Sequence, residues 1–443
     1  MQGARVIVVG LGKSGISAAK LCLSRGAHVI GTDSAPLEKL SPEVRSLGIE
    51  IVAGGHAGVP FSDCDLVIVS PGVPALPELE RAEAAGAEVI GELEFACRSI
   101  NAPILAVGGT NGKSTTTTLL AELLTASGKR VFAGGNLGTP AAEAVGHEYD
   151  AVVLEVSSFQ LERAPSFRPH VSVLLNISED HLDRYPSFLA YAEAKGNAFV
   201  NQTADDFAIV PSGDGECERQ ARRGRGRLVH FGGAGDYAVD AHGVVETASG
   251  ERFDLEASKL FGRHNRENAA AAIAAARALG ASLEAARRAL VEFTPLPHRM
   301  ALAGTVRGVR FYDDSKGTNV GAAVTALRGL NEARGVLIAG GRDKLGSYEP
   351  LVQALVERGR AAVLIGEAAD RIAEAIAGRV RMERAASMND AVATAFALAQ
   401  PGDAVLLSPA CSSFDMFKSY ADRGQKFVEA VALLCAEEGE VKS

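Results

Sequence analysis

The sequence contains no tryptophan, few aromatic residues and no long apolar segment. Aromatic residues occupy 5% of the 443 positions, and alanine, valine, leucine and glycine dominate, a composition typical of parallel sheets covered by helices. No apolar run approaches the roughly 20 residues that a membrane-spanning helix needs, and residues 1–5 lead into a predicted strand without an apolar signal segment. We therefore expect a cytoplasmic protein without membrane insertion.

Cysteine motifs and an excess of positive charge are absent too. The six cysteines are scattered, with no Cys-x-x-Cys pair and no histidine at zinc-finger spacing, which favours reduced thiols. The formal net charge of -9 argues against a nucleic-acid partner, because nucleic acids select concentrated positive charge. One basic cluster, Arg222, Arg223, Arg225 and Arg227, lies in the glycine-rich and charged segment 212–227, where we expect a solvent-exposed loop or hairpin.

Short apolar runs rich in β-branched residues alternate with amphipathic or alanine-rich stretches along the chain. This alternation is typical of βα units that build parallel sheets. Length and pattern favour three domains, at residues 1–92, 93–296 and 297–443, with a linker at Pro295 and Pro297. The clearest predicted strands are residues 6–9, 28–31, 66–69, 104–107, 151–154, 171–175, 336–339, 362–365 and 404–407, and the clearest helices are 267–279 and 282–292.

The segment Gly108–Thr115 (GGTNGKST) lies between a predicted strand and a predicted helix. Backbone N–H groups in such a turn can surround phosphate oxygens, with Lys113 facing the β- and γ-phosphates and the Ser114 hydroxyl placed for a magnesium ion. Val107 stands where the first glycine of the usual P-loop is expected, so we predict a shortened loop. The alternative is a glycine-rich turn with an incidental lysine.

Two further residues follow predicted strands in the same region. Glu155 and His181 could converge on the same metal, because ligands of parallel sheets collect at the carboxyl ends of strands. Each of them taken alone could equally be a surface or capping residue.

A second glycine motif opens the chain. Gly10–Gly15 (GLGKSG) follows a predicted strand, and Asp33 closes the next strand, as the sequence rule for dinucleotide binding requires. A nicotinamide dinucleotide, a nucleotide sugar, or a tight turn needed only for helix packing all fit this pattern. The two motifs predict an α/β protein with a Rossmann-like N-terminal domain, a central P-loop-type ATPase domain with a mostly parallel sheet, and a Rossmann-like C-terminal domain.

The order of motifs resembles the Mur ligase family over essentially the whole chain. The matching segments are residues 109–115, 155–161 and 176–185, then 262–265 with Asn268, then 298–299, and finally 314–319. Each of them is modest, but their joint occurrence is specific.

Within that family, segments 157–162 and 408–415 are most similar to the members that add D-glutamate. The resemblance implies an ATP-dependent ligase that joins D-glutamate to UDP-N-acetylmuramoyl-L-alanine through an acyl phosphate during peptidoglycan precursor synthesis. It also implies ATP and two magnesium ions at the site, and we expect a monomer.

The resemblance carries expected roles for individual residues. The UDP substrate would contact Lys13, Ser14, Asp33, Ser34, Ser70, Pro71, Gly72 and Asn136. ATP would contact Gly109, Thr110, Asn111, Gly112, Lys113, Ser114, Thr115, Asn268, Arg299 and Asp314. D-Glutamate would contact Lys316, Thr318, Lys344, Ser413, Phe414 and Tyr420.

Lys113, His181 and Lys195 are the catalytic residues that the resemblance implies, and Ser114, Glu155, His181 and carbamylated Lys195 are its metal ligands. Carbamylation would turn the Lys195 ammonium into an oxygen anion able to bind a hard cation. Without the resemblance, Lys195 would be an exposed helical lysine.

Three other functions remain open at this point. They are a related ligase that adds a different amino acid or adds glutamate to folate, an NAD-dependent oxidoreductase, and a regulatory nucleotide-binding module without chemistry. Because ATP and the amino acid would be held by different domains, we also expect domain closure during the reaction.

Overall fold

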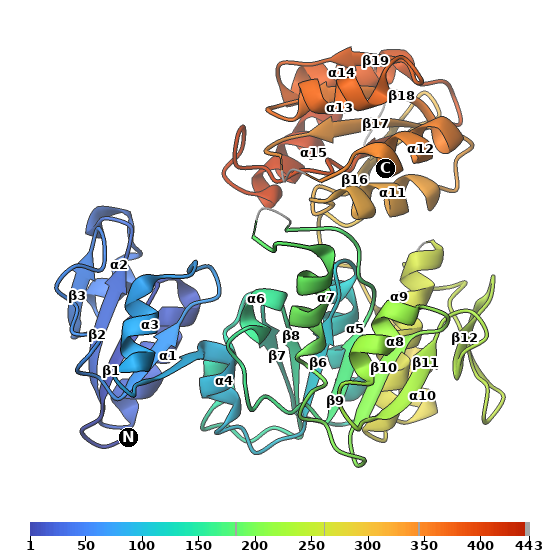
Figure 1. Cartoon of the computed structure of the whole chain (residues 1–443). Coiled ribbons are helices and arrows are strands. Elements are labelled where there is room, and N and C mark those ends of the chain that lie inside the picture. Colours follow the sequence, from blue (N-terminus) through green and yellow to red (C-terminus); the bar gives the residue numbers. More distant parts are fainter. Residues whose placement is uncertain (182–183, 261, 344–345, 439–443) are drawn as a thin grey trace. The chain divides into compact units, whose positions relative to one another are not determined.

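The computed structural model describes residues 1–181, 184–260, 262–343 and 346–438, which form three mainly parallel sheets covered by helices (Figure 1). The predicted three-domain α/β fold is therefore confirmed, whereas the boundaries at residues 92 and 296 stay predictions. The chain forms two compact units. The first comprises residues 1–177, 189–257 and 267–292, and the second comprises residues 178–188, 258–266 and 293–443. No helix of the described residues is long and apolar enough to cross a membrane.

The first sheet has the strand order β3-β2-β1-β4-β5, and the strand pairs are parallel. Val6 and Val8 of β1 face one helical layer, whereas Ile7 and Val9 face the other, as the alternation of side chains along a strand requires. The elements are β1 (Arg5–Val9), α1 (Lys13–Ser24), β2 (His28–Asp33), η1 (Leu37–Lys39), α2 (Pro42–Arg45), β3 (Glu50–Ala53), β4 (Leu66–Val69), α3 (Pro77–Ala84), β5 (Glu88–Gly91) and α4 (Glu92–Cys97).

The central sheet has the order β14-β13-β12-β11-β10-β9-β6-β8-β7, and its strands from β7 to β11 are parallel. Strand β6 is buried along its whole length between β8 and β9, so their carboxyl ends lie at one edge. The elements are β6 (Ile104–Gly108), α5 (Lys113–Ala126), β7 (Val131–Gly135), η2 (Ala141–Ala144), β8 (Ala151–Glu155), α6 (Ser158–Leu161), β9 (Val171–Leu174), α7 (Phe188–Gly196), β10 (Phe207–Pro211), α8 (Gly215–Ala221), β11 (Arg227–Phe231), β12 (Tyr237–Val239), β13 (Gly243–Glu246), β14 (Glu251–Asp254), α9 (Arg263–Ala278) and α10 (Leu283–Glu292).

The third sheet has the order β15-β16-β20-β17-β18-β19, with only β15 antiparallel to its neighbour among the described strands. Helices α11 to α13 contribute to the core on one face, and α14 and α15 to the core on the other. The elements are β15 (Ala301–Val306), β16 (Val309–Asp313), α11 (Val320–Arg328), β17 (Gly335–Gly340), α12 (Glu349–Arg358), β18 (Gly359–Ile365), α13 (Ala369–Ile376), β19 (Met382–Arg384), α14 (Met388–Leu398), β20 (Ala404–Leu407) and α15 (Tyr420–Glu437).

The segment 212–227 was predicted to be a loop or hairpin, and this prediction is wrong. Helix α8 lies there, and its first turn is stabilised because the Asp214 carboxylate accepts hydrogen bonds from the backbone N–H groups of Glu216 and Cys217. The density of glycine and charge in this segment concealed the helix. Buried Cys217 and Ala221 join a small core with β10, which outweighs the weak local propensity.

Candidate active site

The turn between β6 and α5 is built from glycines in conformations that other residues rarely adopt. Gly109 has φ 141° and Gly112 has φ 85°, and Gly112 is the residue that precedes the first turn of α5. A Cβ atom at Gly112 would overlap the Asn268 side chain, so α9 packs directly against the turn. Because backbone approaches side chains this closely, the turn keeps the fixed shape that phosphate binding requires.

The loop after β9 fixes the turn from the other side. The backbone N–H of Thr110 donates to the Asn176 carbonyl at 3.0 Å, and that of Asn111 donates to the Asn176 side-chain oxygen at 2.9 Å. The Thr110 hydroxyl also lies 3.2 Å from the buried hydroxyl of Tyr191 on α7. Residues from β6, β9 and α7 thus meet at one point.

Two lysine side chains converge on the carbonyl of Gly109. Lys113 Nζ donates to it at 2.9 Å and also to the Thr110 carbonyl, and Lys195 Nζ donates to it at 2.8 Å. Lys195 is 3% exposed, and its Nζ lies 4.5 Å from the centre of the Tyr191 ring. Like charges this close in a buried site repel one another, so the arrangement favours an anion or a modified lysine.

Glu155, the last residue of β8, places a carboxylate at the same edge of the sheet. Its side chain is 3% exposed, and Oε1 accepts a hydrogen bond from Asn136 Nδ2 at 2.6 Å. Among the described residues, Oε2 is buried and has no hydrogen-bond partner. A buried carboxylate oxygen without a partner is costly, and magnesium is a hard cation that prefers such oxygens.

The donor set around Glu155 therefore fits a magnesium ion. Ser114, which directly follows Lys113, is the first buried residue of α5. Within the described ranges, no group of three or more His, Cys, Asp or Glu side chains could hold a metal without other donors. Magnesium usually takes one or two carboxylates and completes its shell with water and substrate phosphates, which matches a site of this kind.

The glycine motif of the first domain lies where the strand order reverses. The chain runs from β1 outward to β2 and β3 and then returns to β4 on the other side of β1. Ligands of open parallel sheets bind at such a switch point. The turn closes tightly there, because the Ser70 hydroxyl donates to the Gly10 carbonyl at 2.7 Å and a Cβ at Gly15 would overlap the same carbonyl.

Asp33 holds this first turn in place. Its Oδ2 accepts from the backbone N–H of Leu11 at 2.7 Å, and its Oδ1 accepts from that of Ala35 at 2.8 Å. Lys13 and Ser34 are exposed. The structure thus brings together the predicted residues Lys13, Ser14, Asp33, Ser34, Ser70, Pro71 and Gly72 at one edge of the first sheet. Asn136 lies instead in the central domain beside Glu155.

In the second unit, Asp314 follows β16 and is 9% exposed. Burial raises the pKa of its carboxyl to about 7, although the Ser408 hydroxyl, which donates to Oδ2 at 2.7 Å, and the positive charge of Arg299 both oppose that shift. The geometry places the predicted residues Arg299 and Asp314 together in this unit. Asn268 belongs to the first unit.

The residues predicted to hold D-glutamate differ in their exposure to solvent. Lys316 Nζ lies 3.8 Å from the centre of the Tyr420 ring, a cation–π contact that places an ammonium group beside an aromatic face. Ser413 is 2% exposed, whereas Phe414 is 68% exposed. Thr318 donates its backbone N–H to the Lys316 carbonyl at 2.8 Å.

Arg423, which the sequence did not single out, ties these segments together. It is fully buried on α15, and its guanidinium donates to the Ser315 hydroxyl and carbonyl and to the carbonyls of Cys411 and Ser412 at 2.9–3.3 Å. Burial lowers its pKa to about 10. Its only signal in the sequence is a charged residue on the apolar stripe of a helix, which is seldom decisive.

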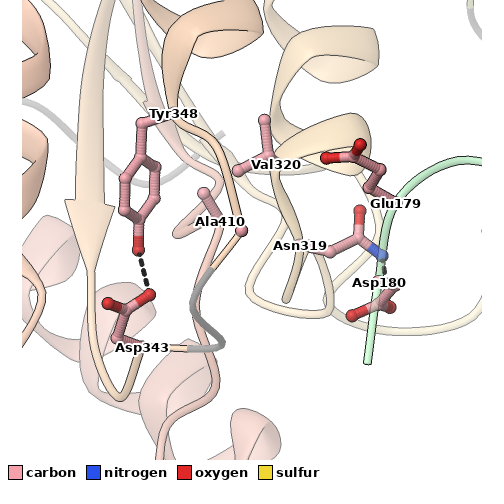
Figure 2. A pocket seen from close by; sticks show the side chains of 8 residues that line it. Glu179, Asp180, Asn319, Val320, Asp343, Tyr348 and Ala410 are labelled. Carbon is pink, nitrogen blue, oxygen red and sulfur yellow. Dashed lines mark hydrogen bonds between the residues drawn. The ribbon is translucent and has the colours of Figure 1, made fainter. Parts of the chain in front are cut away.

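The second unit also contains a small pocket, whose lining includes Asp180, Asn319, Asp343, Tyr348 and Ala410 (Figure 2). Asn319 caps α11 and donates through Nδ2 to Asp180 Oδ2 at 3.1 Å, and the Tyr348 hydroxyl donates to Asp343 Oδ1 at 2.9 Å. The first of these hydrogen bonds connects Asp180 to the N-terminus of α11. Lys344, predicted to hold D-glutamate, lies outside the described residues.

His181 belongs to this same segment. It has φ 56°, and its backbone N–H donates to the Asp180 carboxylate at 3.0 Å. Residues 182–183, which follow it in the predicted metal-binding segment, lie outside the described residues. Glu155 belongs to the first unit and His181 to the second, so their shared metal stays a prediction.

Fold and site together define an α/β nucleotide-binding protein in which a Rossmann-like domain precedes, and another follows, a P-loop-type domain along the sequence. Three family models match in the same order: the Mur ligase MurD-like N-terminal domain at residues 4–91, the Mur ligase middle domain at 107–276, and the Mur ligase glutamate ligase domain at 298–411. The chain belongs to the Mur ligase family.

Curated relatives match along nearly the whole length. UDP-N-acetylmuramoylalanine--D-glutamate ligase of Desulfosudis oleivorans is 44% identical over 98% of this chain and 97% of its own, and the protein of that name from Geotalea daltonii is 44% identical over 98% of both. Among solved structures, a pseudomurein peptide ligase type C from Methanothermus fervidus shares the fold with a TM-score of 0.64 at 18% identity, over 98% of this chain and 100% of its own.

Proposed function

We propose that the protein is an ATP-dependent ligase that joins D-glutamate to UDP-N-acetylmuramoyl-L-alanine, forming ADP and phosphate in peptidoglycan precursor synthesis. The observation that carries the proposal is the convergence of Lys113 and Lys195 on one phosphate-binding turn, beside buried Glu155, whose Oε2 has no hydrogen-bond partner in the part of the chain that the structure describes. The names and near full-length similarity of the curated relatives support the choice of substrates.

The reaction needs activation because a carboxylate oxygen is a poor leaving group at neutral pH. The alanyl carboxylate attacks the γ-phosphorus of ATP, the bond to ADP breaks, and an acyl phosphate forms. The neutral amine of D-glutamate then attacks the acyl carbon, phosphate leaves, and the amine loses a proton. Lys113, anchored on the turn, spreads the charge that develops during transfer.

Magnesium, when bound, supplies Lewis-acid polarisation of the transferring phosphoryl oxygens. Ser114 and Glu155 hold it in our assignment, with Asn136 orienting the Glu155 carboxylate. Lys195 joins them as a carbamate: its neutral amine adds to the carbon of CO₂ and a proton is released, so that the buried ammonium becomes an anion. This change would also relieve the repulsion between the two lysines at Gly109. His181 remains assigned to a second magnesium ion.

The other assignments follow the chemistry of the side chains. The edge of the first sheet suits a diphosphate joined to a sugar, because it has backbone N–H groups and a turn that the Asp33 carboxylate holds in place through hydrogen bonds. Asn268, Arg299 and Asp314 are assigned to the nucleoside and phosphates of ATP. Lys316 and Thr318, in a segment tied down by Arg423, are assigned to D-glutamate, because an ammonium and hydroxyls match its two carboxylates. We place the protein in the cytoplasm as a monomer.

A coupled assay tests the proposal. ADP formation should require UDP-N-acetylmuramoyl-L-alanine and D-glutamate together, with phosphate stoichiometric with the new amide bond. The same assay with a panel of amino acids and a folate acceptor separates this ligase from its relatives. ADP formation that ignores D-glutamate, or ATP binding with no ADP formed, would contradict the assignment.

A further inference from the structure

Arg223 sits just beyond α8 in the basic cluster, and its guanidinium reaches the end of another helix. Nη1 donates to the Glu193 carbonyl at 2.6 Å, and Nη2 donates to the Asn197 side-chain oxygen at 2.9 Å. Glu193 lies in the last turn of α7 and Asn197 directly follows the helix, at the end where carbonyls lose their intrahelical partners. A cation at a helix C-terminus is also favoured by the helix dipole.

The glycine at the end of α7 shows that this approach is built into the packing. A Cβ at Gly196 would overlap the Gln220 amide and lie 2.6 Å from Arg223 Nη1, so another residue at this position would push the guanidinium away. Gln220 is fully buried and accepts a hydrogen bond from Arg223 Nη1 at 3.0 Å, which orients the fork. The contact therefore depends on Gly196 at the end of α7, on Gln220 of α8 and on Arg223 just beyond α8.

The turn that Arg223 binds carries Lys195. This lysine directly precedes Gly196, and its Nζ must reach the Gly109 carbonyl through a buried path beside Tyr191. The carbonyls of Lys195 and Gly196 in turn accept the N–H groups of Ala198 and Phe199. Movement of the last turn of α7 would move the Lys195 amino group relative to the phosphate-binding turn.

We propose that Arg223 is a positioning residue of the reaction: it locks the last turn of α7 so that the side chain of Lys195 stays at the phosphate-binding turn. The inference rests on the proposed function, because it deepens the role assigned to Lys195. Arg223 is exposed to solvent, as predicted for the basic cluster, although its guanidinium also donates hydrogen bonds to Glu193, Asn197 and Gln220.

Arg222 provides a matched control. It lies next to Arg223, but its guanidinium pairs with Glu218 on its own helix α8, in an exposed i,i+4 ion pair. Such pairs contribute little, so Arg222→Gln should behave as the parent protein. Arg223→Lys keeps the charge but loses the fork that reaches two acceptors.

The test uses the full chain and two measurements. Hydrogen exchange should speed up at the amides of Ala198 and Phe199 in Arg223→Gln and Arg223→Lys, but not in Arg222→Gln. The kcat of both Arg223 variants should fall roughly 10-fold with little change in the KM for the UDP substrate, since a displaced catalytic group lowers turnover without touching the other site. Added bicarbonate should restore part of the lost kcat by driving carbamylation of a less well placed lysine.

Equal hydrogen-exchange rates at Ala198 and Phe199 in the Arg223 and Arg222 variants would overturn the inference. Faster exchange in the Arg223 variants would also overturn it if their kcat and their response to bicarbonate equalled those of the parent protein. A ¹³C signal from a carbamate after labelling with ¹³CO₂ should weaken in Arg223→Gln. If the parent protein has no ligase activity at all, the proposed function fails, while the exchange data still decide whether Arg223 holds α7.

Discussion

The protein contains two glycine-rich turns of the same local design, and they differ in the charges that surround them. Each follows a buried parallel strand and opens a helix, at the carboxyl edge of its sheet. The turn of the first domain is held by the carboxylate of Asp33, with its own lysine, Lys13, exposed. The turn of the central domain is held by backbone and amide groups and receives the amino groups of Lys113 and Lys195.

In our assignment, this difference separates a turn that binds a substrate from a turn at which phosphoryl transfer takes place. The first turn, which is closed by an acid, can accept a diphosphate through its backbone, but its lysine among the described residues, Lys13, is exposed. The central turn receives the amino groups of part-buried Lys113 and buried Lys195, and we assign the buried carboxylate of Glu155 beside it to a metal. In our assignment, the glycine pattern predicts where phosphate is bound, whereas the surrounding charges predict where phosphoryl transfer occurs.

Among the variants of the two turns, Lys113→Ala should lower kcat the most. We expect kcat to fall by roughly 10³-fold or more, because the variant loses a cation at the transferring phosphoryl group. Binding of the UDP substrate, measured by calorimetry, should change little. Lys13→Ala is the matched substitution in the first turn. A larger loss of kcat in that variant than in Lys113→Ala would contradict our assignment of the two turns.

Glu155→Gln should have the next largest effect. Its amide can still accept the Asn136 hydrogen bond but offers no anionic oxygen to a hard cation, so we expect roughly 10²-fold lower kcat and a higher magnesium concentration for half-maximal activity. Magnesium titrations of the parent, Glu155→Gln and the exposed control Glu148→Gln measure this. An unchanged magnesium requirement in Glu155→Gln would show that the metal does not use this carboxylate.

Asp33→Asn should affect only the first turn. The variant keeps one acceptor but loses the charge that strengthens the bonds from the Leu11 and Ala35 N–H groups, a loss of about 1–2 kcal/mol. The KM for the UDP substrate should rise roughly 10-fold at nearly constant kcat. Steady-state kinetics with the exposed control Glu38→Gln check this, and a selective fall in kcat would contradict it.

Glu92 is a second buried glutamate, and unlike Glu155 we expect it to affect the stability of the fold and not the reaction. It begins α4, Oε1 accepts from the Ala142 N–H at 2.7 Å, and burial raises its pKa to about 7, with Glu143 adding to the shift. The folded protein therefore binds a proton that the unfolded chain releases near pH 4.5, so this group lowers stability as pH rises from about 4.5 to about 7.

Glu92→Gln removes that titration and should be more stable than the parent above pH 7, by roughly 1–3 kcal/mol. The gain should vanish near pH 4.5. Urea unfolding at several pH values measures it, with unchanged turnover expected because Glu92 lies outside the site. A stability difference that does not depend on pH would show that Glu92 stays ionised in the folded protein.

Much of this architecture was predictable from local sequence. Strands β4 and β20 begin and end where their apolar runs do, and α5 begins at Lys113 because a glycine in the left-handed region precedes it. The Rossmann-like fold of the first domain was predicted from the glycine spacing and Asp33. These features depend on near neighbours, which a sequence displays directly.

Other features depend on contacts between distant segments and could not be predicted. Helix α8 forms because Cys217 packs into a core with β10, and Arg423 gains its role only when α15 places it beneath Ser315. The convergence of Lys195 on Gly109 joins residues 86 positions apart. For Lys195, the family resemblance indicated importance, but only the structure gives the contact.

The central claim is that the terminal phosphoryl group of ATP is transferred to a substrate carboxylate at the turn that carries Lys113. The most direct test labels both oxygens of the alanyl carboxylate of UDP-N-acetylmuramoyl-L-alanine with ¹⁸O and follows them through one turnover with D-glutamate. The account predicts inorganic phosphate that carries one ¹⁸O atom, since the acyl phosphate gives up its bridging oxygen when the amine attacks. Phosphate released without the label would contradict it.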